Sequence, residues 1–211
     1  MNKPLIVIGA GGHAKVLMHI LLLQKSVILG LADADANRLG QEILGVKING
    51  NDDWVFGHDP KTVELVNGVG SIDQPRVRQS IFEKFKSKGY NFAQVIHPSV
   101  IQAAEIDLGE GVQIMAGAIL QPSVRIGLNT LVNTGAIVDH DCQIGNHCHL
   151  APGVTLSGSI SVGFGTHIGT GASIIQGVRI GQNCVIGAGA LVRKNVADHS
   201  VAVGVPAKVR T

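Results

Sequence analysis

Aromatic side chains are scarce in this chain of 211 residues: tryptophan and tyrosine occur once each, phenylalanine occurs five times, and together they make up 3% of the sequence. Glycine, by contrast, occurs 28 times, and hydrophobic residues account for 45%. A core of this composition is built mainly from aliphatic and small side chains, and the glycines allow many tight turns. The length is enough for one large domain or two small ones.

The chain also lacks a strong charge of either sign, because 17 Lys and Arg are balanced by 15 Asp and Glu. The sequence has no long charged run of the kind that would indicate nucleic acid or an anionic membrane as a partner. The apolar runs are too short to span a bilayer, and the first residues lack the apolar core and cleavage site of a signal peptide. We therefore expect a soluble cytoplasmic protein that neither binds nucleic acid nor inserts into a membrane.

From Ile106 onward the chain repeats every six residues. The third residue of each hexad is aliphatic fifteen times in succession: Leu108, Ile114, Leu120, Ile126, Val132, Val138, Ile144, Leu150, Leu156, Val162, Ile168, Ile174, Ile180, Ile186 and Val192. A helix does not keep a strict period of six, because six residues turn through more than one and a half turns. Positions one and three of a short strand point to the same side, so each hexad predicts a strand with two inward side chains. A corner rich in Gly and Asn follows each strand, and three sides close a triangular coil.

The three cysteines, Cys142, Cys148 and Cys184, all occupy the first position of a hexad, where the side chain is small or β-branched. The sequence contains no CxxC pair and an odd number of cysteines, which argues against a disulfide framework. We interpret them as buried structural residues and not as nucleophiles or metal ligands.

Before the repeat, strand and helix patterns alternate. Apolar runs predict strands at 5–8, 27–32, 63–66 and 92–96, with helices at 15–23 and 74–88, which is typical of a small parallel α/β unit. His97-Pro98 marks the change of pattern. We therefore expect a Rossmann-like nucleotide-binding domain at 1–97 and a coil domain at 98–211.

Gly9-x-Gly11-x-x-Ala14 follows the first strand and precedes a helix, as in the dinucleotide-binding fingerprint. Glycines let the backbone approach a pyrophosphate, and the helix N-terminus stabilises its charge. Asp33 follows the second strand, where an acidic residue contacts a ribose. A tight turn without a ligand is the competing interpretation. Because a unit of this size is half of a full dinucleotide fold, one nucleotide diphosphate fits it better than NAD.

The coil resembles the left-handed parallel β-helix acyltransferases of the hexapeptide family, whose eighteen-residue coils would give five coils here. With the N-terminal unit, nearly the whole chain resembles nucleotide-sugar N-acetyltransferases of the bacillosamine-pathway and perosamine type, and sialic acid O-acetyltransferases are similar. The most specific stretch runs from Asn133 to Gly145 (NTGAIVDHDCQIG), followed by His149, and the tail Gly204-Val-Pro-Ala-Lys208 also matches. The resemblance implies acetyl transfer from acetyl-CoA, with no metal. The acceptor is the amino group of a nucleotide-diphosphate-linked aminodeoxysugar, such as UDP-4-amino-4,6-dideoxy-GlcNAc or GDP-perosamine, in the synthesis of a bacterial surface glycan or glycoprotein.

Acetyl transfer requires a base, because the amine or hydroxyl loses a proton as it attacks the thioester, and histidine suits this role near neutral pH. His140 falls at position five of its hexad, at a corner outside the packed positions. We expect His140 to be the base, and the resemblance implies that Asp141 orients it and raises its basicity.

The resemblance implies further site residues. Gly158, one coil after His140, provides an amide for the oxyanion. Acetyl-CoA is contacted by His149, Thr170, Ala188 and Lys208, and the nucleotide sugar by Gly11, Gly12, His13, Asp33 and Gly68. Relatives can carry a second acidic residue where this chain has Ala34, so the choice between UDP and GDP stays open. The resemblance also implies a homotrimer with acetyl-CoA between subunits, and we expect Ile119, Leu128 and Leu131 to be exposed apolar residues compatible with it.

Three alternatives remain open. A sialic-acid-type O-acetyltransferase differs only in its acceptor, and the nucleotide-binding fingerprint favours an amino sugar. A zinc enzyme of the carbonic anhydrase type would need three protein ligands. His149 and His167 are eighteen residues apart, but no obvious third histidine accompanies them, since His147 leaves its corner in another direction. A non-catalytic binding protein is disfavoured by the His140-Asp141 pair.

Overall fold

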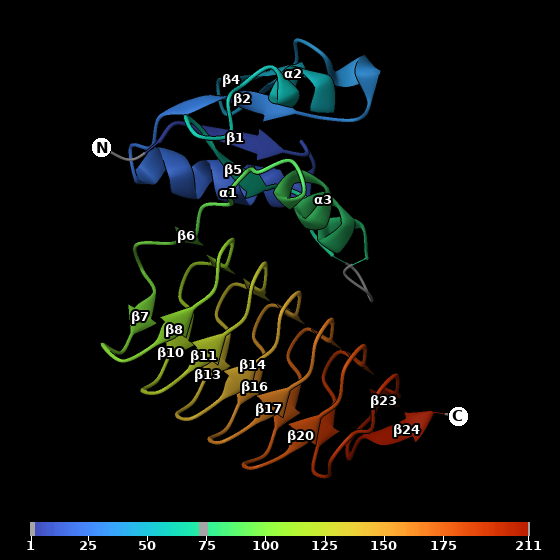
Figure 1. Cartoon of the computed structure of the whole chain (residues 1–211). Coiled ribbons are helices and arrows are strands. Elements are labelled where there is room, and N and C mark those ends of the chain that lie inside the picture. The colour runs from blue at the N-terminus through green and yellow to red at the C-terminus, as the bar shows by residue number, and fades with distance from the viewer. Residues whose placement is uncertain (1–2, 72–75, 211) are drawn as a thin grey trace. The chain divides into compact units, whose positions relative to one another are not determined.

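The computed structural model describes residues 3–71 and 76–210 (Figure 1). The chain divides into two compact units, one made of Met1–Gly70 and Val77–Pro98, the other of Ser71–Arg76 and Ser99–Thr211. Among the described residues, no helix has the length and apolar character needed to cross a membrane.

The first unit is an α/β unit built on a five-stranded sheet with the order β3-β4-β2-β1-β5. Its strands are β1 (Leu5–Ile8), β2 (Ile28–Ala32), β3 (Glu42–Ile43), β4 (Val46–Gly50) and β5 (Glu64–Asn67), and β6 (Val95–Ile96) follows later in the chain. Its helices are α1 (Gly12–Leu23), the short 3-10 helix η1 (Ala36–Arg38), α2 (Asp52–Phe56) and α3 (Arg76–Lys86). All pairs in the five-stranded sheet are parallel except β3 with β4. With β2 on one side of β1 and β5 on the other, the carboxyl end of β1 is the place where doubly wound sheets bind ligands.

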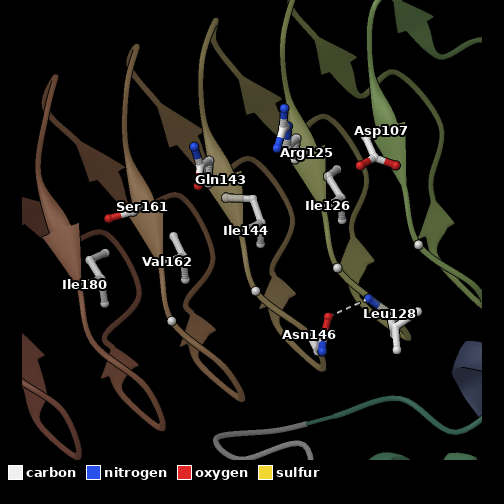
Figure 2. A pocket seen from close by; sticks show the side chains of 14 residues that line it. Asp107, Arg125, Ile126, Leu128, Gln143, Ile144, Asn146, Ser161, Val162 and Ile180 are labelled. Carbon is white, nitrogen blue, oxygen red and sulfur yellow. Dashed lines mark hydrogen bonds between the residues drawn. The ribbon is translucent and has the colours of Figure 1, made fainter.

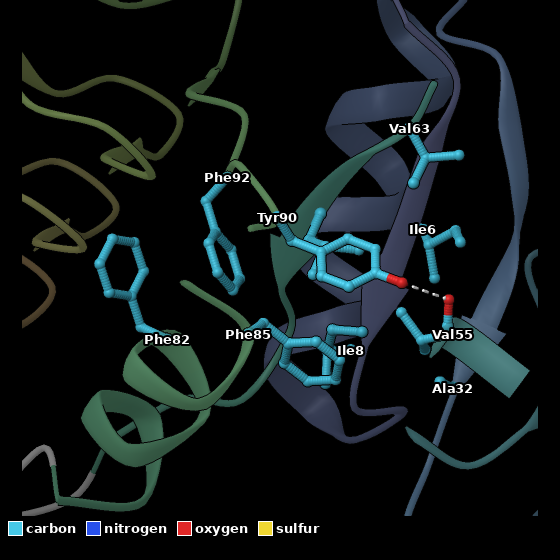
Figure 3. Close-up of a cluster of buried hydrophobic side chains, with 10 residues drawn as sticks. Ile6, Ile8, Ala32, Val55, Val63, Phe82, Phe85, Tyr90 and Phe92 are labelled. Atoms are coloured by element: carbon cyan, nitrogen blue, oxygen red, sulfur yellow. Dashed lines mark hydrogen bonds between the residues drawn. The ribbon is translucent and has the colours of Figure 1, made fainter. Parts of the chain in front are cut away.

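Most of the chain's few aromatic residues lie together in the core of this unit, where Phe85, Tyr90 and Phe92 pack beside Ile6 and Ile8 (Figure 3). The hydroxyl of Tyr90 lies 2.9 Å from the carbonyl oxygen of Val55 and 2.7 Å from that of His58, so this buried polar group is hydrogen-bonded.

The element positions differ from the sequence prediction in several places. Helix α1 starts at Gly12, three residues earlier than expected, because Gly12 belongs to its first turn although glycine has a low helix propensity. The strands β3 and β4 and the helix α2 were not predicted, since 40–57 is rich in Gly, Asn and Asp and shows no clear apolar period. Gln74, where the third helix was expected to begin, lies outside the described residues.

The second unit is a left-handed parallel β-helix whose two-residue strands form three faces. Face 1 contains β7 (Ile101–Gln102), β10 (Ile119–Leu120), β13 (Ile137–Val138), β16 (Thr155–Leu156), β19 (Ser173–Ile174) and β22 (Leu191–Val192). Face 2 contains β8 (Asp107–Leu108), β11 (Arg125–Ile126), β14 (Gln143–Ile144), β17 (Ser161–Val162) and β20 (Arg179–Ile180). Face 3 contains β9 (Gln113–Ile114), β12 (Leu131–Val132), β15 (His149–Leu150), β18 (His167–Ile168), β21 (Val185–Ile186), β23 (Val201–Val203) and β24 (Lys208–Arg210). Strands pair with partners eighteen residues away, as Ile119 does with Ile137, so the coils have the expected length until the last one, where Val185 pairs with Val201 only sixteen residues later.

Three corners join these faces: the first corner joins face 1 to face 2, the second joins face 2 to face 3, and the third joins face 3 to the next face 1. The last residue of every hexad from 111 to 189 has a positive φ, whether it is glycine or not. Asp141, for example, has φ 59°. The corner geometry therefore repeats with the hexad, and Gly, Asn and Asp are the residues that adopt it at least cost.

At the second corner the coils approach closely because a column of glycines leaves no side chain between them. A Cβ atom on Gly127 would lie 2.3 Å from Oδ1 and 2.6 Å from the backbone nitrogen of Asn146 in the next coil. Figure 2 shows this corner, where the Leu128 amide donates to Asn146 Oδ1 over 2.9 Å. The groove beside it measures about 470 Å³, and the side chains of Asp107, Arg125, Gln143 and Ser161 border it on face 2.

Replacing Gly127 with alanine should destabilise the coil by about 2 kcal/mol, because backbone atoms of the next coil must move to make room for the methyl group. Thermal unfolding followed by circular dichroism should show a lower midpoint than the wild type. Gln121→Ala is the matched control, since Gln121 has the same hexad position at the first corner and is exposed. Equal midpoints for the two variants would contradict this account of the glycine column.

One exposure prediction is wrong. Leu131 is fully buried, at 0% exposure, while Leu128 is exposed and Ile119 is half-buried. Leu131 points outward from face 3, but the outward residues Gln113 and His149 of the same face are buried as well. An outward direction on a coil predicts exposure only where no other segment covers that face, and hexad position does not report such covering.

Candidate active site

His140 and Asp141 form a hydrogen-bonded pair at the first corner. Nδ1 of His140 lies 2.7 Å from Oδ2 of Asp141, and both side chains are at least half exposed. The backbone amide of His140 donates to Oδ1 of Asp139 over 2.7 Å, which holds the backbone of the corner. The hydrogen bond that His140 donates to Asp141 raises the pKa of His140, and the charges of Asp139 and Asp141 add to this effect. The pair therefore has the geometry of a carboxylate-oriented imidazole.

Gly158 lies directly against the imidazole ring of His140. A Cβ atom on Gly158 would lie 2.5 Å from both Cε1 and Nε2 of the ring, so no larger residue fits while the ring stays in place. The next residue, Ser159, donates its backbone amide to the carbonyl oxygen of His140 over 2.8 Å. The eighteen-residue spacing thus brings the predicted base and the predicted oxyanion glycine into direct contact.

A basic pocket lies at the C-terminal end of the same corner. His140, Gly158, Gln176 and Lys194 follow one another at eighteen-residue intervals, so Lys194 lies three coils, roughly 14 Å, beyond His140. A pocket of about 530 Å³ is lined there by Arg193, Lys194 and Lys208 together with apolar residues. Lys208 reaches it because β24 folds back antiparallel to β23. These cations favour a negatively charged ligand.

The structure does not bring all the predicted acetyl-CoA residues to the corner of His140. Thr170 and Ala188 are exposed at the third corner, one above the other. His149 lies on face 3 and is 7% exposed. Its Nδ1 lies 2.8 Å from Ser71 Oγ and 3.1 Å from the Ser71 carbonyl oxygen. Within one chain, the predicted site is therefore split between different edges of the coil.

Asn133 is a polar neighbour of His149 that the sequence analysis did not single out. Its Nδ2 lies 3.3 Å from Nε2 of His149, and the ring of His149 also meets that of His167 edge to face at 4.8 Å. Asn133 opens the motif that carried the family resemblance, and this was the signal that could have identified it.

In the first unit, the turn after β1 is open at Gly11 and Gly12. A Cβ atom on either glycine would meet nothing within 4 Å, and Gly11 has φ −80°, which any residue adopts. Neither packing nor backbone conformation within the chain therefore requires glycine at these positions. Gly11 is the N-cap of α1 and makes no side-chain capping bond. An open surface at a helix N-terminus suits the close approach of an anion such as a diphosphate.

Asp33 ties the ends of the first two strands together. Its Oδ2 accepts from the backbone amide of Ala10 over 2.7 Å and from Nη1 of Arg38 over 3.2 Å, while Oδ1 accepts from the amide of Asp35 over 3.0 Å. A carboxylate has about four acceptor positions, so one stays available for a ligand hydroxyl.

Gly68 and His13 lie beside the turn that follows β1. A Cβ atom on Gly68 would lie 2.8 Å from the carbonyl oxygen of Ile8 and 2.9 Å from that of Gly9, so the end of β5 packs closely on the end of β1. His13, in the first turn of α1, is half-buried, and Gly70 lies beside its Cβ. The structure thus gathers the predicted nucleotide residues of the first unit at the carboxyl ends of β1, β2 and β5. Over residues 3–71 and 76–210, no group of three or more His, Cys, Asp or Glu side chains is arranged to hold a metal ion.

Comparisons with known proteins identify both parts of the chain. Residues 4–85 match the PglD N-terminal domain family, and residues 159–194 match the bacterial transferase hexapeptide (six repeats) family. Curated protein sequences provide no match.

Solved structures match over almost the full length. PerB from Caulobacter crescentus, crystallised with CoA and GDP-perosamine, has 36% identity and a TM-score of 0.90, with 99% of this chain and 97% of that chain covered. The acetyltransferase domain of PglB from Neisseria gonorrhoeae FA1090, in complex with acetyl coenzyme A, has 30% identity and a TM-score of 0.91, with 100% of both chains covered. WeeI from Acinetobacter baumannii AYE has 25% identity and a TM-score of 0.87, with 98% of this chain and 99% of that chain covered. By its fold, its site geometry and these likenesses, the chain is an acyltransferase that belongs to the hexapeptide-repeat nucleotide-sugar acetyltransferases.

Proposed function

We propose that this enzyme transfers the acetyl group of acetyl-CoA to the amino group of a nucleotide-diphosphate-linked aminodeoxysugar, with His140 as the general base. The observation that carries the proposal is the 2.7 Å contact between His140 Nδ1 and Asp141 Oδ2, with Gly158 against the other edge of the ring. The ligands of PerB, CoA and GDP-perosamine, support the substrate class. As in the family, the reaction would take place in the cytoplasm and supply a bacterial surface glycan or glycoprotein.

The geometry suggests how the proton moves. With Nδ1–H donating to Asp141, the lone pair of Nε2 is free to accept a proton from the substrate amine. The amine nitrogen attacks the thioester carbonyl, and the C–N bond forms as Nε2 takes the proton. The backbone amide of Gly158 stabilises the oxyanion of the tetrahedral intermediate. The C–S bond then breaks, and the CoA thiolate leaves and is protonated by His140.

The split between corners supports a site shared by subunits. Thr170 and Ala188 would line the acetyl-CoA channel from the third corner of one subunit, facing the first corner of its neighbour. The expected homotrimer provides such a pairing of corners. The basic pocket with Arg193, Lys194 and Lys208 is placed to bind phosphate groups of CoA, which carry several negative charges.

In the first unit, the diphosphate of the nucleotide sugar would lie at Gly11 and Gly12, against the N-terminus of α1. Asp33 would accept a ribose hydroxyl with its remaining acceptor position, and His13 and Gly68 would border the same ligand. The absence of a second acidic residue at Ala34 leaves uridine and guanosine as alternatives.

The role of Asp141 predicts a change in the pH profile. Asp141→Asn keeps a hydrogen-bond acceptor near Nδ1 but removes the charge, so the raised pKa of His140 should fall toward its ordinary value. Because the base acts in its deprotonated form, the acidic limb of kcat/KM should move to lower pH. The plateau should drop about tenfold, since a less basic imidazole accepts the proton less readily. An acidic limb that does not move in this variant would contradict the role of Asp141.

A panel of UDP- and GDP-linked amino sugars with acetyl-CoA tests the function directly. Release of the CoA thiol, followed with a thiol reagent, measures the reaction, and mass spectrometry identifies the acetylated product. All three cysteines of the chain are buried, and burial raises the pKa of each thiol, that of Cys148 to about 12, so they should contribute little background. Acetylation of a sialic-acid-type hydroxyl with no turnover of any amino sugar would favour the O-acetyltransferase alternative. Binding without turnover of either acceptor would favour a binding protein.

A further inference from the structure

A buried arginine contacts the backbone turn that follows β5, next to the candidate nucleotide site of the first unit. Arg78, in the first turn of α3, is 1% exposed. Its Nη1 donates to the carbonyl oxygen of Asn67 and to that of Val69, each over 2.9 Å. These two carbonyls flank Gly68, so a single guanidinium nitrogen holds both sides of the glycine.

Asn67 completes the arrangement from the other side. Its Nδ2 donates to the backbone carbonyl of Arg78 over 2.9 Å, and its Oδ1 accepts from the amide of Val69 at 3.3 Å. Asn67 is itself 1% exposed. The segment Asn67–Gly70, here called the β5 loop, is therefore tied to α3 by reciprocal hydrogen bonds, in which the buried side chains of Arg78 and Asn67 each donate to the other residue's backbone carbonyl.

The β5 loop packs on the turn that would receive the diphosphate. The Gly68 amide donates to the carbonyl oxygen of Ile8 over 2.7 Å. A Cβ atom on Gly9 would lie 2.7 Å from Cγ2 of Val69, so the two segments leave no spare room. A shift of the β5 loop toward β1 would push on Gly9 and change the path of the backbone at Gly11 and Gly12.

Burying a guanidinium is expensive, and a well-packed apolar side chain of similar volume often serves stability as well or better. Burial lowers the pKa of Arg78 to about 9, which leaves the side chain charged at neutral pH. A charged donor gives stronger hydrogen bonds to carbonyls than a neutral one, and its planar fork fixes their direction. The arrangement thus gains a defined loop shape at a cost in desolvation.

We propose that Arg78 is a positioning residue of the nucleotide site, which holds the β5 loop in the shape that leaves Gly11 and Gly12 open to a nucleoside diphosphate. The proposal rests on the proposed function, because the ligand class comes from it. Arg78 touches backbone carbonyls and acts on the ligand only through the β5 loop.

The test measures binding of UDP and of GDP by calorimetry, together with steady-state kinetics, in Arg78→Met and Arg78→Lys. Arg78→Met should weaken binding of the preferred nucleotide and raise KM for the nucleotide sugar by roughly tenfold to a hundredfold, since two charge-assisted hydrogen bonds are lost. KM for acetyl-CoA and kcat should stay within about twofold of the wild type, because the coil residues are unchanged. Arg78→Lys keeps the charge and one donor direction and should recover part of the affinity. Arg76→Met removes an exposed arginine from the same helix and should behave as the wild type.

The possible outcomes distinguish a failure of the role of Arg78 from a failure of the proposed function. A wild-type enzyme that binds neither UDP nor GDP would overturn the proposed function, and the inference with it. A wild type that binds one of them while Arg78→Met binds it equally well would overturn the inference alone. A fall in kcat together with a rise in KM for both substrates would assign Arg78 a general structural role and would also overturn the inference. If Arg78→Met does not fold, the same comparisons are made with Arg78→Lys, whose melting curve shows whether it is native.

Discussion

Replacing His140 with alanine should lower kcat/KM for acetyl transfer by about 10³-fold, within the range of 10²–10⁴ that a positioned general base contributes. The attacking amine must lose its proton as the C–N bond forms, and without the imidazole the proton passes to water. Because the side chain is half exposed and lies at a corner, its removal should leave the coil folded. Steady-state kinetics with the nucleotide sugar identified in the panel would measure the loss, and circular dichroism would confirm the fold.

His199→Ala is the matched control, since His199 is another exposed histidine at a corner with a positive φ. It should retain wild-type activity. The acidic limb that His140 imposes on the pH profile should disappear in His140→Ala but persist in the control. Undiminished transfer by His140→Ala would show that the proposed mechanism is wrong, even if the substrate class were right.

Gly158→Ala should reduce kcat by about 10²-fold with little change in stability, because misplacement of a catalytic group by about 1 Å has an effect of that order. The new methyl group would lie 2.5 Å from Nε2 of His140, and the nearest atoms belong to a half-exposed side chain. The ring can turn away at low cost, whereas at Gly127 the obstructing atoms include backbone. The two glycine variants are therefore expected to differ: Gly127→Ala should lose stability, and Gly158→Ala should lose activity.

Gln182→Ala serves as the control for Gly158→Ala, because Gln182 is exposed and has the same hexad position at the second corner. Kinetics and melting curves of the three proteins would be compared under one condition. A Gly158→Ala enzyme with normal kcat would mean that the ring position observed here is not needed for catalysis. A large fall in its melting temperature would mean that the methyl group displaces the coil and not the ring.

Much of the candidate site followed from sequence because the coil is a local structure repeated in register. Each hexad sets its own strand and corner, and eighteen residues return the chain to the same edge one coil away. His140 and Gly158 could therefore be placed together by their spacing alone, as could Thr170 and Ala188. The same register places the cysteines inside, and they are buried. In the first unit, the turn after β1 was recognisable because a strand, glycines and a helix start follow one another within a few residues.

Other features depend on contacts between segments whose separation in sequence is not set by the hexad repeat. Leu131 and His149 are buried although their hexad position points outward, and the two oxygens of Ser71 beside His149 come from 78 residues away. The hydrogen bonds from Arg78 to the carbonyls of Asn67 and Val69 join a helix to the end of a strand. In the sequence, nothing distinguishes Arg78 from the other residues of an amphipathic helix.

The sequence by itself determined the triangular coil, the positions of its corners and the placing of His140 next to Asp141 and Gly158, because adjacent or periodic residues carry these features, whereas the left-handed turn was implied by the family resemblance. Only the tertiary structure decided that the outward residues Gln113, Leu131 and His149 of face 3 are buried, and that a buried guanidinium supports the β5 loop. These depend on how elements distant in sequence pack against one another, and the free energy of that packing is spread over contacts that leave no local pattern.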